Sequence, residues 1–143
     1  MTTVLVPLDA DEGRTQRQVD ALTALSLGVD VEVLLLHVYE PVDAPGMDMA
    51  GSSIADINDA LEELQGLPAG LADADADLQD AGFRTRLLTA VGETAAEIVA
   101  SASQEEADII VLATRRQSPV GKALFGSVAQ SVILDTDVPV LVV

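Results

Sequence analysis

The run Val4-Leu5-Val6-Pro7-Leu8, which ends at Asp9, is apolar at every position. A short, continuous apolar run is typical of a strand buried on both faces, because a half-exposed strand alternates apolar and polar residues. Helix-forming sequence follows directly, with Asp11 as a candidate cap and apolar residues at helical spacing up to about Leu27. A buried strand that leads into an amphipathic helix predicts the first unit of a parallel sheet.

Four further segments read as strands, and stretches with helical spacing separate them. The predicted strands are residues 4–8, 31–39, 83–90, 108–113 and 138–143. The predicted helices are residues 11–27, about 54–81 with a break near 66–68, 94–103 and 127–135. This alternation predicts an α/β fold: a five-stranded parallel sheet, doubly wound, with helices on both faces and right-handed crossovers. Neither a repeat nor a linker divides the chain, so we expect one domain over residues 1–143.

Two of the predicted helices open with a capping-box pattern, in which a Ser or Thr precedes a Glu or Gln by three residues. Thr94 and Glu97 have this spacing in one helix, and Ser127 and Gln130 have it in the last. We therefore expect the side chains of Thr94 and Ser127 to cap these helices.

The charge of the chain is strongly unbalanced. Its 143 residues include 24 Asp and Glu but only 7 Lys and Arg, for a formal net charge of −17. Duplex nucleic acid requires a basic face that displaces phosphate counterions, so this partner is excluded, and an anionic membrane surface is disfavoured for the same reason. We interpret the carboxylate density as adaptation to a high-salt cytoplasm, where screening relieves self-repulsion. The alternative is an acidic protein without salt adaptation.

Several classes of site are excluded by residue types that the chain lacks. The sequence contains no cysteine, which excludes disulfides, thiolate metal sites and Cys nucleophiles. Its single histidine, His37, excludes a multi-His metal site and is expected to be a hydrogen-bonded core or rim residue. No apolar run approaches the roughly 20 residues of a membrane-spanning helix, and the amino terminus has no signal-peptide pattern. We therefore expect a cytoplasmic protein.

Basic residues gather after the predicted fourth strand, where a doubly wound sheet binds ligands at its carboxyl edge. Three of the seven bases, Arg115, Arg116 and Lys122, lie in this loop, and Gly126 and Ser127 open the next helix. The free N–H groups of a helix start can hold an anion, so the loop favours a phosphate-like ligand. Alternatively, the arginines neutralise neighbouring carboxylates and Ser127 serves only as a helix cap.

Three ligand motifs are ruled out by their spacing. A P-loop ending at residues 121–122 would need Gly at 116 and Ser or Thr at 123, where the chain has Arg116 and Ala123. No dinucleotide-binding G-x-G-x-x-G follows the first strand. An EF-hand loop opening at Asp73 would need Gly and Glu where the chain has Leu78 and Arg84. We expect no metal site there, and instead a solvated helix face formed by Asp73, Asp77 and Asp80.

Six segments match, in order, the pattern of one protein family. They are Val6-Pro7-Leu8-Asp9, Leu36-His37-Val38, Gly92-Glu93-Thr94-Ala95-Ala96-Glu97-Ile98, Ala107-Asp108-Ile109-Ile110-Val111-Leu112-Ala113-Thr114-Arg115, Leu124-Phe125-Gly126-Ser127-Val128 and Val138-Pro139-Val140-Leu141-Val142-Val143. Together they resemble the universal stress protein family over the whole chain. The resemblance implies an adenine nucleotide alpha hydrolase-like fold with strand order 3-2-1-4-5.

The resemblance also implies where ATP or another adenine nucleotide would bind. Pro7, Asp9 and Val38 would line the adenosine end. The residues along the ribose and phosphates would be Gly92, Arg115, Gly126, Ser127 and Val128.

One part of the family's nucleotide motif is altered in this chain. The nucleotide-binding subgroup has G-x-x-G, nine residues, then G-[S/T]. The chain keeps Gly126-Ser127 but has Ala113 and Arg116 at the two earlier glycine positions. The long side chain of Arg116 either blocks the phosphate path or pairs with a phosphate.

The function implied by residues and resemblance is that of a cytoplasmic, non-enzymatic stress-response protein whose cleft takes an adenine nucleotide or a small anion. The alternatives are a slow ATPase or nucleotidyl-transfer enzyme on the same fold, and an interaction module with a vestigial cleft. We also expect a homodimer through residues 138–143, because an apolar strand at a sheet edge invites pairing with a second copy.

Overall fold

The structure of the chain, a computed structural model, describes residues 1–25, 27–28, 30–41, 67–114 and 126–143. The strands are β1 (Thr2–Pro7), β2 (Val31–Tyr39), β3 (Arg84–Val91), β4 (Ile109–Leu112) and β5 (Val140–Val142). The helices are α1 (Glu12–Ala24), α3 (Leu71–Asp80), α4 (Thr94–Gln104) and α5 (Ser127–Asp135). No helix among these described residues is long and apolar enough to cross a membrane.

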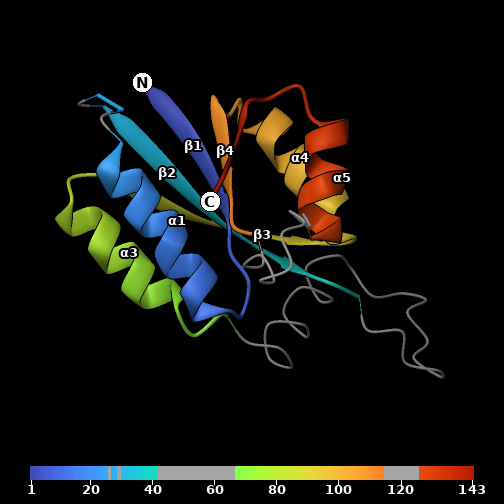
Figure 1. The fold of residues 1–143 in the computed structure, drawn as a ribbon, viewed down its shortest axis with the longest axis horizontal. Helices are drawn as coiled ribbons and strands as arrows, with labels where there is room; N and C mark the ends of the chain where they lie inside the picture. Colours follow the sequence, from blue (N-terminus) through green and yellow to red (C-terminus); the bar gives the residue numbers. More distant parts are fainter. Residues whose placement is uncertain (26, 29, 42–66, 115–125) are drawn as a thin grey trace, which may run out of the picture.

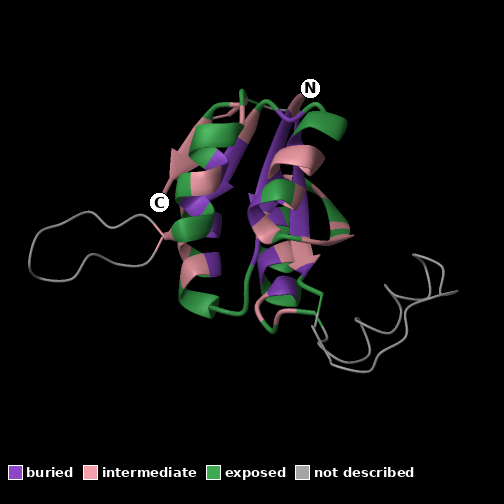
Figure 2. Cartoon of the chain, turned by 90° about the vertical axis from the view of Figure 1, so that its right-hand side faces the viewer, coloured by how far each residue is buried: buried purple, intermediate pink, exposed green. Residues whose placement is uncertain are grey.

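All neighbouring strands of the sheet pair in parallel, in the order β3-β2-β1-β4-β5. Helices α1 and α3 lie together on one face of the sheet, and α4 and α5 lie together on the other (Figure 1). Seen from the side, the buried residues concentrate between the two helical layers (Figure 2). This architecture confirms the doubly wound α/β fold expected from the sequence pattern and the strand order implied by the family resemblance.

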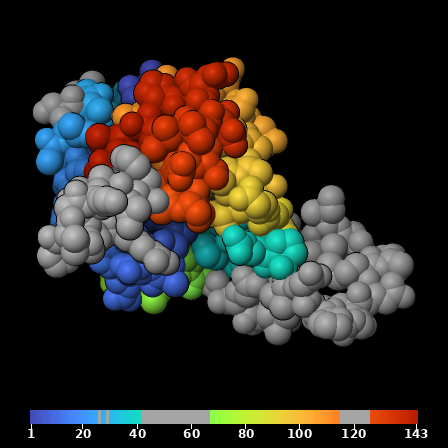
Figure 3. Space-filling model, turned by 45° about the vertical axis from the view of Figure 1, so that its right-hand side comes forward, coloured from blue at the N-terminus to red at the C-terminus, as the bar shows by residue number. Residues whose placement is uncertain are grey.

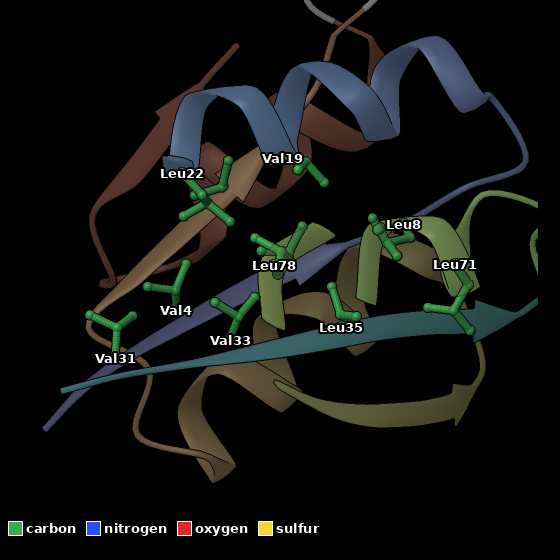
Figure 4. Packing of buried hydrophobic residues seen from close by; sticks show 12 residues of the cluster. Val4, Leu8, Val19, Leu22, Val31, Val33, Leu35, Leu71 and Leu78 are labelled. Carbon is green, nitrogen blue, oxygen red and sulfur yellow. The ribbon is translucent and has the colours of Figure 1, made fainter. Parts of the chain in front are cut away.

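Two apolar clusters, one on each face of the sheet, explain why the central runs 4–6 in β1 and 33–36 in β2 are continuously apolar. Val4 and Val33 point toward α1 and α3, where they meet Val19 and Leu78 (Figure 4). Their neighbours in sequence point the other way, so that Leu5 belongs to the cluster under α4 and α5. Because successive side chains of a strand face opposite sides, a strand covered on both faces must be apolar at every position.

The helix starts differ from two of the three expected caps. Asp11 caps α1 as expected, since its carboxylate accepts a hydrogen bond from the N–H of Arg14 at 2.9 Å. The cap of α4 is Glu93 rather than Thr94, because the Glu93 carboxylate accepts from the N–H groups of Ala95 and Ala96. Residue Gly126, which has no side chain, occupies the cap position of α5, and Ser127 is the first helical residue. Both capping-box expectations were therefore wrong.

Several element boundaries also differ from the sequence-based expectations. Helix α1 ends at Ala24, about three residues early, and β5 covers only Val140–Val142. The predicted helix over 54–81 corresponds to α3 in its last part, whereas residues 54–66 lie outside the described residues. The expected solvated face is confirmed, because the α3 side chains of Asp73, Asp77 and Asp80 are all exposed.

Asp108 joins the amino ends of β1 and β4, and its removal gives a first testable prediction. Its N–H donates to the carbonyl of Thr3 at 2.8 Å, and its carboxylate accepts from the N–H of Thr3 at 2.7 Å. Asp108→Ala should lower the free energy of unfolding by about 1–2 kcal/mol, because a hydrogen bond to a charged acceptor is lost. Asp108→Asn keeps an acceptor oxygen and should cost less. Denaturant titration in multimolar KCl measures both, and equal losses for the two variants would contradict the hydrogen-bond explanation.

Candidate functional site

A cavity of about 470 Å³ lies at the carboxyl ends of β1 and β2, on the side of the sheet that α4 covers. Its walls come from the segment after β1, the end of β2 and the start of α4; the lining residues are Pro7, Leu8, Asp9, Ala10, Leu36, His37, Val38, Glu40, Pro41, Thr94 and Ile98. In the space-filling view the end of β2, in cyan, lies against the yellow residues that precede and begin α4 (Figure 3). Cavities of roughly 300–1,000 Å³ are typical of small-molecule sites.

The position of this cavity follows from the winding of the sheet. The chain continues from β1 to β2 on one side, whereas β4 pairs on the other side of β1. The connections therefore leave the sheet in opposite directions next to β1, and ligands of doubly wound folds bind at this switch point, beyond the carboxyl ends of the strands.

Asp9 places an oriented carboxylate at this cavity. One oxygen of Asp9 accepts from the N–H of Asp11 at 2.8 Å, and the other accepts from Nε of Arg14 at 2.8 Å. The Asp9 side chain is still 53 % exposed, so it faces solvent as well as its two partners. The carboxylate is thus held in one direction without being buried.

The ionised carboxylate of Asp11, in the same turn, stabilises the start of α1. The hydrogen bond from the N–H of Arg14 holds the pKa of Asp11 below its usual value; desolvation opposes this effect, and the nearby Arg14 charge adds to it. A carboxyl whose pKa is lowered by folding adds stability above its unfolded pKa. This contribution is lost as the pH falls through the folded-state pKa of Asp11, so the start of α1 weakens in acid.

The end of β2 and the start of α4 are tied together beside the cavity. The hydroxyl of Thr94 donates to the carboxylate of Glu40 at 2.5 Å. His37, half-buried at the rim, has Nδ1 3.4 Å from the carbonyl oxygen of Leu8 and packs edge-on against the ring of Tyr39, with centroids 4.5 Å apart. This arrangement agrees with the expected rim histidine.

The residues expected at the adenosine end come together, whereas those expected along the phosphates do not join them. Pro7, Asp9 and Val38 all line the cavity. Gly92, Gly126, Ser127 and Val128 do not line it, although Gly92 contacts the end of β2 by donating its N–H to the carbonyl of Tyr39 at 3.0 Å. Arg115 and Arg116 lie outside the described residues.

Gly92 has a backbone conformation that residues with a side chain rarely adopt. Its φ is +154°, and a Cβ atom built there would lie 2.5 Å from a carboxylate oxygen of Glu97. The tight turn after β3 therefore depends on glycine, and this turn delivers α4 and its first residue, Thr94, to the cavity wall.

Sequence reasoning missed the contribution of α4 and α1 to this region. Thr94 and Ile98 line the cavity, but in the sequence they have only the features of a helix start and of a core position. Gln18 of α1, buried to 2 % exposure, donates to the carbonyls of Pro7 and Val111. A polar residue on the apolar face of a predicted helix is a signal for such a bond, since buried amides require partners.

The order of the parallel strands, the two helical layers and the cavity at the carboxyl edge define an adenine nucleotide alpha hydrolase-like fold. Within that class the chain belongs to the universal stress protein family, whose family model matches residues 1–143.

Individual relatives agree with this assignment. The chain is 30% identical over 123 residues to the universal stress protein MJ0577 of Methanocaldococcus jannaschii. This match covers 78% of the chain and 76% of MJ0577. The solved structure of MJ0577 matches with a TM-score of 0.72 and 26% sequence identity. The match covers 99% of this chain and 94% of the MJ0577 chain. An Archaeoglobus fulgidus universal stress protein in complex with dAMP has the same fold, with a TM-score of 0.66, 24% identity, and coverage of 99% and 97%. A universal stress protein in complex with cAMP matches with a TM-score of 0.69, 24% identity, and coverage of 99% and 96%.

Proposed function

We propose that this protein is a non-enzymatic stress-response regulator that binds an adenine nucleotide in the cavity at the ends of β1 and β2. The observation that carries the proposal is that cavity, with the oriented Asp9 carboxylate and the apolar Pro7 and Val38 in its walls. Universal stress proteins of the same fold were solved with dAMP and with cAMP, which supports an adenine nucleotide as the ligand. The protein would act as one domain in a salt-rich cytoplasm.

The proposed division of the site follows the family resemblance. Pro7, Asp9 and Val38 contact the adenosine, and a second group lies along the ribose and phosphates: Gly92, Arg115, Arg116, Gly126, Ser127 and Val128. A regulator is favoured over an ATPase because both Asp9 oxygens already accept hydrogen bonds. This arrangement suits a carboxylate that orients a ligand better than one that removes a proton.

Filling the cavity tests the ligand site directly. Ala10 is exposed and lines the cavity, so Ala10→Trp should abolish binding of AMP and ATP by occupying the space while leaving the core intact. Isothermal calorimetry in multimolar KCl measures the binding. The matched control is Ala24→Trp, an exposed position at the end of α1 outside the cavity, which should bind like the parent chain. Parent and Ala10→Trp chains with the same affinity would contradict a ligand in this cavity.

The altered glycine position gives a second test. Arg116 stands where the family's nucleotide-binding subgroup has glycine. If its side chain obstructs the phosphates, Arg116→Gly should tighten ATP binding by on the order of tenfold, about 1.4 kcal/mol. AMP, with fewer phosphates, should gain less. Calorimetry that shows tight ATP binding by the parent and weaker binding by Arg116→Gly would instead identify Arg116 as a phosphate ligand.

We propose a homodimer as the working form of the protein. β5 lies at the edge of the sheet, and residues 138–143 carry no charged or polar side chain. A second copy that pairs along this edge would cover it, since a two-fold contact uses the same patch on both subunits.

A further inference from the structure

Arg17 and Gln18, neighbours on α1, both bind backbone carbonyls at the carboxyl ends of the two central strands. Nε2 of Gln18 donates to the carbonyl oxygen of Pro7, in β1, at 2.8 Å and to that of Val111, in β4, at 3.0 Å. The guanidinium of Arg17 donates to the carbonyl of Thr114, two residues beyond β4. One helix therefore holds three carbonyls at the point where β1 and β4 part.

The side-chain amide of Gln18 lies just beyond the last backbone pairing between β1 and β4. β1 and β4 pair only at Val4 with Ile109 and at Leu5 with Ile110, although β1 continues to Pro7. Proline has no N–H to donate to a neighbouring strand. The two hydrogens of one side-chain amide instead satisfy a carbonyl on each strand, which matters because a buried carbonyl without a donor is costly.

The carbonyl of Pro7 lies at the start of the segment, residues 7–10, that lines the cavity. The next residue, Leu8, is held from the other side, where its N–H donates to the carbonyl of Leu36 in β2 at 2.8 Å. Asp9 and Ala10 follow directly and line the cavity. One bond from α1 and one from β2 thus hold the two residues at which this segment leaves β1.

We propose that Gln18 and Arg17 are positioning residues for the nucleotide cavity. Neither lines it, but Gln18 fixes the segment that carries Asp9, and Arg17 fixes Thr114, the residue before Arg115. This inference rests on the proposed function, since it names the residues that shape that site. A purely structural Gln18 would add stability without changing the affinity for a ligand.

Two substitutions of Gln18 and one control on the same helix separate these roles. Gln18→Met has similar size but donates no hydrogen bond. Gln18→Glu donates one only when its carboxyl is protonated. Val19→Ala is the control: Val19 is 3 % exposed and packs in the core, but it binds no strand-end carbonyl, so it should destabilise the fold without moving Asp9.

The readouts are the Kd for AMP and backbone amide exchange of residues 8–10 in the ligand-free chain, both in multimolar KCl where every variant is folded. Gln18→Met should weaken AMP binding by roughly tenfold and speed exchange at residues 8–10. Val19→Ala should lower the melting temperature but leave Kd and local exchange unchanged. The ratio of the Gln18→Glu Kd to the parent Kd, taken at each pH, should fall toward one as acid protonates the new carboxyl.

The inference is overturned if Gln18→Met keeps both parent values, or if Val19→Ala changes them equally. A parent chain that binds no adenine nucleotide at millimolar concentration would remove the proposed function. In that case the exchange rates alone decide whether Gln18 positions residues 8–10.

Discussion

The melting temperature is expected to rise by on the order of 10 °C between low and multimolar KCl, because salt screens the repulsion of a surface with net charge −17. The helices add to this repulsion. None of α1, α3, α4 and α5 has a basic residue in its last turn, and α3 ends at Asp80, where the helix dipole disfavours a negative charge. Thermal melts followed by circular dichroism measure the effect. A melting temperature that is flat or falls with KCl would contradict the proposed adaptation to high salt.

Salt also strengthens apolar burial, so a charge variant is needed to isolate screening. Asp80→Lys replaces an exposed carboxylate at the end of α3 with a cation that suits the helix dipole. It should raise the melting temperature at low KCl and converge with the parent at high KCl. A constant difference at all concentrations would mean that screening is not the cause.

The proposed dimer should be lost when the open edge of β5 loses one backbone donor. The carbonyls of Pro139 and Val143 accept from β4 and from Thr114, and the N–H of Val143 donates to Leu112, so these residues face inward. Because successive N–H groups of a strand point to opposite sides, those of Val140 and Val142 point to the open edge. Val142→Pro should therefore give a monomer, since proline has no N–H and its ring blocks a partner strand.

Sedimentation at micromolar concentration in high KCl distinguishes the two states. Val142→Ala is the matched control, because it shortens the side chain but keeps the N–H, and it should remain a dimer. A parent chain that sediments as a monomer would contradict the proposed interface. The competing explanation, an edge covered by residues 41–53, falls almost entirely outside the described residues.

Arg86, in the edge strand β3, forms two ion pairs at the opposite edge of the sheet. Its guanidinium binds Glu32 at 3.0 Å and Glu105 at 2.6 Å, and these two carboxylates raise the pKa of Arg86. The side chain is 48 % exposed, so screening weakens both pairs. These two ion pairs therefore oppose the expected rise of the melting temperature with KCl, because their stabilising contribution is largest at low KCl.

Sequence patterns predicted the class of fold, and the family resemblance predicted the strand order and part of the cavity lining. Strand runs such as residues 4–8 are apolar at every position, and this alone predicts burial on both faces and a parallel sheet between two helical layers. The resemblance to the universal stress protein family implied that Pro7, Asp9 and Val38 lie together at one end of the site, and all three line the cavity. Strand burial could be predicted because the pattern of apolar residues is a local property of the chain.

The long-range contacts around the cavity became visible only in the three-dimensional structure. Thr94 donates a hydrogen bond to Glu40, 54 residues away in the sequence, and Gln18 donates one to Val111, 93 residues away. No local sequence pattern encodes contacts between such distant residues. The cap of α4 is likewise Glu93 rather than Thr94, and the Thr94 hydroxyl instead donates to the carboxylate of Glu40, the residue after β2. Side chains with several available partners take the one that packing brings nearest, and packing depends on the whole fold rather than on their place in the sequence.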